Sequence, residues 1–157
     1  MKLKEFDWIN KPKDIKITSS RKLSYKSTDY HAFIYTFDDN KTIQFKIKAD
    51  CENGLELFLS PGYGIIFKLE DNKIVKETKL FDQKSYDYYS INTNNIVWKI
   101  EKSNDCLFFY FDDTLLTSFT FPSLKGSVSI GPFTNGAGLA EIEFEKMWFI
   151  VIFLIIL

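Results

Sequence analysis

Apolar and polar residues alternate along most of the chain, which is the pattern of β-strands that bury one face. The alternation is most regular over residues 41–49, where polar side chains separate Ile43, Phe45, Ile47 and Ala49. No window of helical length has apolar residues at a period of 3.6. The pattern therefore predicts an all-β protein.

Residues 95–121 predict a meander of three strands joined by two tight turns. The first strand has Ile96, Trp98 and Ile100 on its apolar face. The second strand, residues 106–111, is apolar on both faces, so we expect it to lie centrally in a sheet and to be covered on both sides. Trp98 is then either a core residue or the floor of a groove.

About a dozen short strands follow one another with turn residues between almost every pair, as in antiparallel sandwiches and barrels. Residues 131–138, which are rich in Gly, are expected to form a loop. A final strand is expected from Leu139 to about Ile150. We interpret residues 1–150 as one β-sandwich domain and residues 151–157 as an apolar C-terminal tail.

Residues 147–157 are apolar throughout. As a helix they would reach only roughly half of the ~30 Å hydrocarbon core of a bilayer, so a membrane span is not expected. One interpretation is a buried final strand with an apolar extension. The other is a segment that dips into a membrane or contacts a protein partner. Left exposed, such a stretch promotes aggregation.

The composition supports β structure, because the chain contains 16 Phe and 8 Tyr but only 7 Gly and 4 Pro. A net charge of −1 without a basic stripe argues against nucleic-acid binding. The N-terminal residues contain no apolar run of signal-peptide length, and Cys51 and Cys106 do not require a disulfide. We therefore expect a cytoplasmic protein, whose oligomeric state the sequence does not predict.

Short motifs are spread along nearly the whole chain: Trp8–Pro12, Thr28–Tyr30, Gly54–Leu55, Phe67–Glu70, Val97–Ile100, Gly131–Pro132 and Glu143–Glu145. In this order they resemble a bacterial and fungal family of concanavalin A-like sandwiches. That family is largely of unknown function and includes the yeast regulation-of-enolase protein. The resemblance implies a two-sheet antiparallel jelly-roll sandwich with a ligand groove on the concave sheet. It also implies lectin-like behaviour, since related domains mostly bind or cleave carbohydrate.

Two features depart from that family. Tyr30 and His31 stand where the family tends to have an aromatic pair with Trp, and the chain ends in the apolar tail. Both departures bear on whether a sugar site is retained.

Glu141, Glu143 and Glu145 have a period of two, so a strand would place all three on one face. The spacing resembles the Glu-x-Asp-x-Glu strand of concanavalin A-like endoglucanases, in which one carboxylate is the nucleophile and another is the general acid. Retaining glycosidases hold these two groups about 5–5.5 Å apart, which next-but-one strand residues can reach. A solvated outer strand face has the same pattern, and position 143 has Glu where the motif has Asp.

Aromatic side chains with polar neighbours are candidates for a sugar platform, because a ring offers flat apolar area at little entropic cost. The ligand-binding residues that we predict are Trp8, Asp29, Tyr30, His31, Glu70 and Trp98, with Tyr63, Tyr86 and Tyr88 in the wider aromatic set. Each aromatic residue is also suited to filling the core.

His31 is the only histidine, so neither a zinc site nor a Ser-His-Asp site is predicted. Asp38–Asn40 and Asp112–Asp113 offer oxygen ligands for calcium, but tight turns use the same residues without a metal. The glycine patterns of nucleotide-binding proteins do not occur in the sequence. We therefore expect no metal and no cofactor.

The leading hypothesis is a non-catalytic ligand-binding module that takes carbohydrate on the concave sheet. One alternative is a glycoside-active enzyme that uses Glu141, Glu143 and Glu145. Another is a protein-interaction or regulatory domain that acts through the apolar tail.

Overall fold

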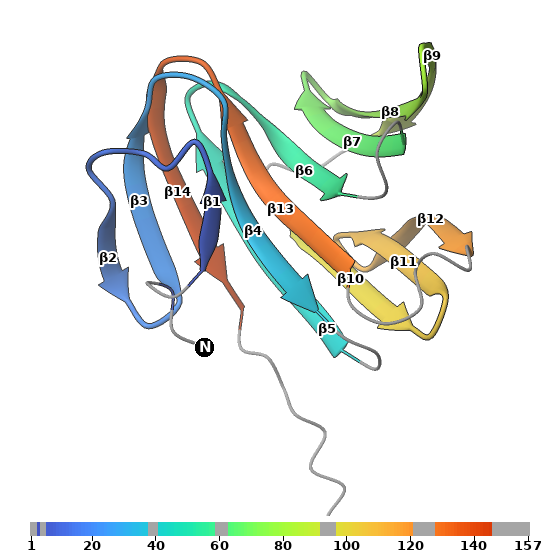
Figure 1. Ribbon diagram of the computed structural model, residues 1–157, viewed down its shortest axis with the longest axis horizontal. Coiled ribbons are helices and arrows are strands. Elements are labelled where there is room, and N and C mark those ends of the chain that lie inside the picture. Colours follow the sequence, from blue (N-terminus) through green and yellow to red (C-terminus); the bar gives the residue numbers. More distant parts are fainter. Residues whose placement is uncertain are drawn as a thin grey trace, which may run out of the picture.

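The computed structural model describes residues 3, 6–37, 41–58, 63–91, 97–120 and 128–145. Within these ranges fourteen strands form two antiparallel sheets of seven strands each (Figure 1). The predicted all-β, two-sheet antiparallel sandwich is therefore confirmed. The described residues contain no helix that is long and apolar enough to cross a membrane.

Sheet A has the strand order β1-β4-β13-β6-β7-β8-β9. Its strands are β1 (Asp7–Ile9), β4 (His31–Phe37), β13 (Val128–Asn135), β6 (Glu52–Phe58), β7 (Tyr63–Glu70), β8 (Lys73–Leu80) and β9 (Gln83–Ser90). Sheet B has the order β12-β11-β10-β5-β14-β3-β2. Its strands are β12 (Thr114–Thr120), β11 (Cys106–Phe111), β10 (Trp98–Ser103), β5 (Lys41–Ala49), β14 (Gly138–Phe144), β3 (Lys22–Ser27) and β2 (Lys16–Ser19).

Neighbouring strands within a sheet are often distant in sequence, as in a jelly roll. The chain passes from one sheet to the other seven times: after β1, β3, β4, β5, β9, β12 and β13. As a result β13 lies between β4 and β6, and β14 lies between β3 and β5. In Figure 1, β4 and β13 of sheet A lie in front of β5 of sheet B.

The inward side chains of both sheets form one hydrophobic core, whose largest fully buried members include Trp98, Phe33, Phe45, Phe67, Phe109 and Phe144. Trp98 is only 1% exposed, and its ring centroid lies 5.5 Å from that of Phe111 and 6.0 Å from that of Phe67. Of the two alternatives predicted for Trp98, the structure selects the core residue. The prediction that Trp98 binds a ligand is wrong, because both sheets cover its ring.

The prediction of a central strand over residues 106–111 is only partly right. β11 pairs with β10 and β12, which places it second from the edge of sheet B. Leu107 and Phe109 are buried, whereas the outward Phe108 and Tyr110 are half-buried. Aromatic side chains on an outward strand face therefore produced the two-sided apolar pattern.

The predicted loop over residues 131–138 is wrong. β13 continues through Gly131 and Pro132 to Asn135, and the turn at Gly136 leads directly into β14. The ladder from β13 to β6 is continuous, but the ladder to β4 has no paired residue at Gly131 or Pro132. Because proline has no N–H to donate, it fits a strand where one ladder is interrupted.

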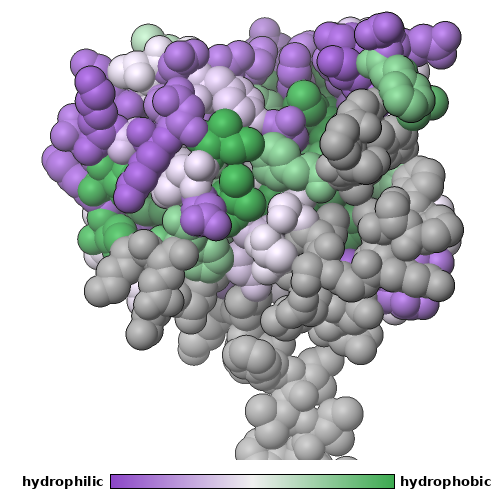
Figure 2. All heavy atoms as spheres, viewed as in Figure 1, coloured by the Kyte–Doolittle hydropathy of each residue, from purple (hydrophilic) through white to green (hydrophobic). Residues whose placement is uncertain are grey.

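Residues 146–157 lie outside the described residues, and with them the end of the predicted last strand and the apolar tail. Within the described residues β14 ends at Phe144. Hydrophilic side chains cover much of the surface in the view of Figure 2, and hydrophobic ones gather near its centre and at its upper right.

Of the two candidate calcium segments, Asp38–Asn40 also lies outside the described residues. Asp112 and Asp113 form the turn between β11 and β12, both at positive φ. Asp112 Oδ1 accepts a hydrogen bond from Val97 N at 2.8 Å, and Asp113 pairs with Lys99 at 3.6 Å. These contacts are those of a tight turn. No group of three or more His, Cys, Asp and Glu among the described residues could hold a metal ion.

Candidate ligand-binding site

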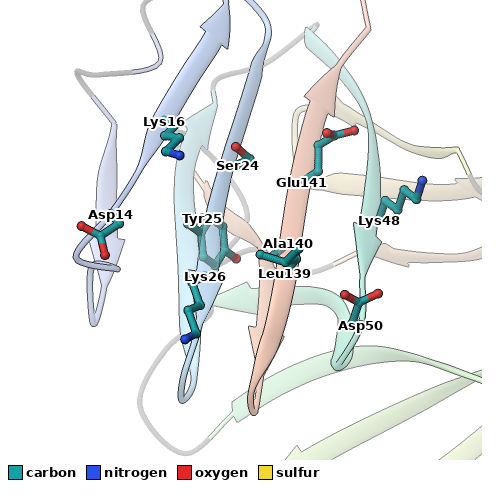
Figure 3. Close-up of a pocket in the computed structure, with 10 residues that line it drawn as sticks. All are labelled: Asp14, Lys16, Ser24, Tyr25, Lys26, Lys48, Asp50, Leu139, Ala140 and Glu141. Atoms are coloured by element: carbon teal, nitrogen blue, oxygen red, sulfur yellow. The ribbon is translucent and has the colours of Figure 1, made fainter.

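The outward face of sheet B is hollowed over β2, β3, β14 and β5 (Figure 3). The hollow has a volume of about 710 Å³, and small-molecule sites measure roughly 300–1,000 Å³. It is lined by Asp14, Lys16, Ser24, Tyr25, Lys26, Lys48, Asp50, Leu139, Ala140 and Glu141.

Strand register brings these residues together. β14 pairs with β3 on one side and with β5 on the other, so Glu141 lies opposite both Ser24 and Lys48. Leu139 lies opposite Lys26, two residues earlier on β14. Because alternate residues of a strand share a face, this second pair stands beside the first on the same outward surface.

Most of the charged side chains that line the hollow make no ion pair with a described residue, and Glu141 is the exception. Lys22 pairs with Glu141 at 3.1 Å and, beside the hollow, Lys46 pairs with Glu145 at 3.4 Å. Within the described residues, no ion pair is made by the other charged groups of the hollow, which are Asp14, Lys16, Lys26, Lys48 and Asp50. Their ammonium and carboxylate groups are available to a ligand.

Of the three carboxylates predicted from sequence, Glu141 and Glu143 lie on the outward face of β14 and Glu145 directly follows the strand, but only Glu141 lines the hollow. Glu143 lies in register between Lys22 of β3 and Lys46 of β5, and Glu145 pairs with Lys46. Retaining hydrolysis needs two carboxyl groups at one cleft, one of them carrying a proton. Of the three, only Glu141 lines the hollow, so they do not form such a pair there.

Tyr25 and Ala140 form the floor of the hollow, and both side chains are buried. Beneath the floor, Tyr25 Oη lies 2.8 Å from Thr134 Oγ1, which in turn lies 3.0 Å from Ser27 Oγ. Burial raises the pKa of the Tyr25 phenol to about 12, while the hydrogen bond with Thr134 opposes the shift and Cys51 adds to it. The site therefore rests on a neutral, hydrogen-bonded layer.

We expect the protein to lose stability as the pH rises from about 10 to about 12. A tyrosine in an unfolded chain loses its proton near pH 10, whereas folded Tyr25 keeps its proton up to about pH 12. In this interval the unfolded state binds fewer protons and is favoured. Urea unfolding should show a loss on the order of 2 kcal/mol that Tyr25→Phe lacks. The same pH profile in both proteins would assign the effect to another group.

Four of the predicted binding residues gather at the start of β4, where they hold β1 in place. Asn10 Nδ2 donates to the Tyr30 carbonyl at 2.8 Å, and Asp29 Oδ1 accepts a hydrogen bond from Tyr30 N at 2.8 Å. The half-buried Trp8 packs edge-on against core rings. The structure brings these residues and His31 together, and the backbone of Tyr30 and the Asp29 carboxylate are used within the protein. The Tyr30 hydroxyl is buried and has no hydrogen-bond partner among the described residues.

Both ring nitrogens of His31 have partners. Nδ1 bonds to the carbonyl oxygen of Asn10, and Nε2 accepts the N–H of Thr28 at 3.3 Å. Since Nε2 accepts, Nδ1 carries the proton and donates. The side chain is 4% exposed. His31 therefore anchors the Thr28 turn to the end of β1.

Glu70 lies apart from these residues, at the turn between β7 and β8, where it pairs with Lys73 at 3.5 Å. Trp98 lies in the core. None of the six residues predicted to bind ligand lines the hollow, which is formed on the other side of β3 and β14 from the core.

Sequence reasoning missed the polar residues of the hollow, which are Asp14, Lys16, Ser24, Lys26, Lys48 and Asp50. Those that lie in strands, Lys16, Ser24, Lys26 and Lys48, are outward polar residues. The sequence pattern does not distinguish them from the polar residues of any solvated strand face. The signal that finds them is the pairing of β14 between β3 and β5, which sequence periodicity does not contain.

No protein-family model and no curated protein sequence matches the chain. A functionally unknown protein from Saccharomyces cerevisiae superposes with a TM-score of 0.69 at 13% identity, over 94% of this chain and 97% of that chain. A beta-glucanase from Bacillus licheniformis superposes with a TM-score of 0.54 at 12% identity, over 84% of this chain and 82% of that chain. The chain has a concanavalin A-like sandwich fold.

A carbohydrate-binding module from Bacillus subtilis is also similar to this concanavalin A-like sandwich, with a TM-score of 0.50 at 14% identity over 80% of this chain and 84% of that chain. Structures with the same fold thus include a carbohydrate-binding module, a glucanase and a protein of unknown function. The predicted resemblance to concanavalin A-like sandwiches is confirmed at the level of the fold.

Proposed function

We propose that the chain is a non-catalytic carbohydrate-binding module and that the hollow of sheet B is its site. The observation that carries the proposal is the set of charged side chains around one hollow that make no ion pair with any described residue. A sugar hydroxyl can accept a hydrogen bond from an ammonium group and donate one to a carboxylate. A carbohydrate-binding module among the structures with the same fold supports this assignment.

The composition of the hollow favours a neutral sugar. Three carboxylates and three ammonium groups line it, so its formal charges cancel. Hydrogen bonds in which one partner is charged are shorter and stronger than neutral ones, which suits the orientation of several hydroxyls at once. Leu139, which is 68% exposed, offers apolar area to the C–H face of a pyranose ring.

The two alternative functions have less support. Catalysis by Glu141, Glu143 and Glu145 is disfavoured because Glu143 and Glu145 stand outside the hollow that Glu141 lines. An interaction through residues 147–157 concerns a segment outside the described residues.

Binding on a glycan array, followed by calorimetry on the strongest ligand, tests the proposal. Asp50→Asn and Lys26→Gln should each weaken binding by about tenfold or more, because each removes a charged hydrogen-bonding partner. Lys99→Gln is the matched control, since Lys99 lies on the same face but outside the hollow and pairs with Glu101 at 3.7 Å. Absence of any glycan ligand, or binding that both hollow variants leave unchanged, would contradict the proposal.

A further inference from the structure

The hairpin of β8 and β9 presents apolar side chains to solvent at its tip. Leu80, the last residue of β8, is 49% exposed, and Phe81 in the turn is 70% exposed. Tyr86 and Tyr88 on β9 are also exposed. This hairpin forms one margin of sheet A, at the upper right of Figure 1, and hydrophobic side chains stand out at the same corner of Figure 2.

Phe81 occupies a backbone conformation that disfavours it. Its φ is 52°, in the left-handed region, where a bulky side chain is an outlier. The other described non-glycine residues with positive φ all have short polar side chains that tolerate this region: Asn10, Asn72, Asn104, Asp112 and Asp113. An exposed phenyl ring at this position costs local stability and gains no burial within the chain.

A second unfavourable feature lies directly behind the tip. Lys79 of β8 and Lys84 of β9 face each other across the ladder, and like charges at opposed positions destabilise a hairpin. Glu77 compensates one of them, since it pairs with Lys84 at 3.2 Å and their hydrogen bond raises the pKa of that ammonium group. Within the described residues Lys79 makes no ion pair.

We propose that this tip docks on an anionic lipid surface, with Leu80 and Phe81 in the boundary between headgroups and acyl chains. Lys79 and Lys84 then lie at the level of the lipid phosphates, where their opposed positive charges are favourable. Apart from Asp82 in the turn, the order from the tip inward is apolar, then cationic, which is the depth order of an anionic membrane surface. A protein pocket for Phe81 would not require the two lysines behind it.

Asp82 is the one acidic residue in the turn itself and opposes approach to an anionic surface. Asp82→Asn should therefore strengthen binding to anionic vesicles. This gain is expected only if the hairpin tip itself contacts the vesicle surface. This signed effect separates electrostatic docking from general adhesion of a destabilised protein.

The test is co-sedimentation of the full chain with phosphatidylcholine vesicles that contain or lack phosphatidylserine. We expect binding to the anionic vesicles, a loss of about tenfold in partitioning for Phe81→Asn, and a smaller loss for Lys79→Gln. Phe81→Asn should also melt at the same or a higher temperature, because asparagine is tolerated at positive φ. A loss of vesicle binding by Phe81→Asn could then not be attributed to a loss of stability.

Leu115→Asn is the matched control, since Leu115 is an exposed apolar residue on β12 of the other sheet. Because every variant keeps residues 147–157, a difference between variants measures the hairpin alone. Partitioning of Phe81→Asn equal to that of the unmodified chain, or equal binding to both kinds of vesicle, would overturn the proposal. The outcome is independent of the glycan experiment, because the hollow lies on sheet B and the hairpin on sheet A.

Discussion

Replacing Trp98 by alanine is expected to lower the free energy of unfolding by about 3–5 kcal/mol, the range for a large buried aromatic side chain. Trp98 is fully buried on β10, opposite Phe45 of β5 and Phe111 of β11. Its removal leaves a cavity that the neighbouring strands cannot close without breaking their own ladders. Urea unfolding followed by far-UV circular dichroism measures the loss.

Tyr88→Ala serves as the control for Trp98→Ala. Tyr88 is 63% exposed on β9, so its truncation should change the free energy of unfolding by less than about 1 kcal/mol. If Trp98→Ala instead kept full stability and lost ligand binding, Trp98 would be part of the binding site and its place in the core would be wrong.

Gly54→Ala is expected to be comparably damaging, for a different reason. A Cβ atom at Gly54 would lie 1.8 Å from the carbonyl oxygen of Phe67 on the paired strand β7. The obstacle is backbone, so no side chain can rotate away, and β6 must separate from β7. We expect a loss of about 3 kcal/mol or more, at the upper end of the range for overpacked sites. Thermal unfolding monitored by calorimetry measures it.

Gly64→Ala provides a matched comparison for Gly54→Ala. Gly64 lies on β7 itself, in the same ladder, and a Cβ there would meet nothing within 4 Å. Both substitutions reduce the entropy of the unfolded chain equally, which by itself stabilises by roughly 0.4–1 kcal/mol. Gly64→Ala should therefore be neutral or slightly stabilising. Equal effects of the two substitutions would show that β6 and β7 are not as closely apposed as the structure has them.

Local alternation predicted the strands well where one face is buried and the other solvated. β5 spans the predicted range, and its inward residues Ile43 and Phe45 are fully buried. Prediction failed where the pairing of a strand with its neighbours, rather than its own sequence, decided its structure. Pro132 is accommodated because one ladder of β13 is interrupted, and the aromatic residues of β11 face outward although the strand looks two-sided.

The candidate site was predicted less well than the fold. The motif on β14 led to Glu141, which does line the hollow, but the other members come from β2, β3 and β5. Trp98 was ambiguous because an inward and an outward tryptophan give the same alternation until the sheet faces are known. Sequence periodicity specifies which residues share a face, but not which strands are neighbours.

The positions of β13 and β14 have a consequence for synthesis of the chain. Without these two strands, the other twelve pair only as four separate pieces: β1 with β4, β6 to β9, β2 with β3, and β5 with β10 to β12. Each piece has open edges of the kind that promote mispairing. On the ribosome, both sheets therefore stay divided until nearly all the strands have been made. The hollow is completed only when β14 joins β3 to β5, so a nascent chain that stops short of β14 lacks the proposed site.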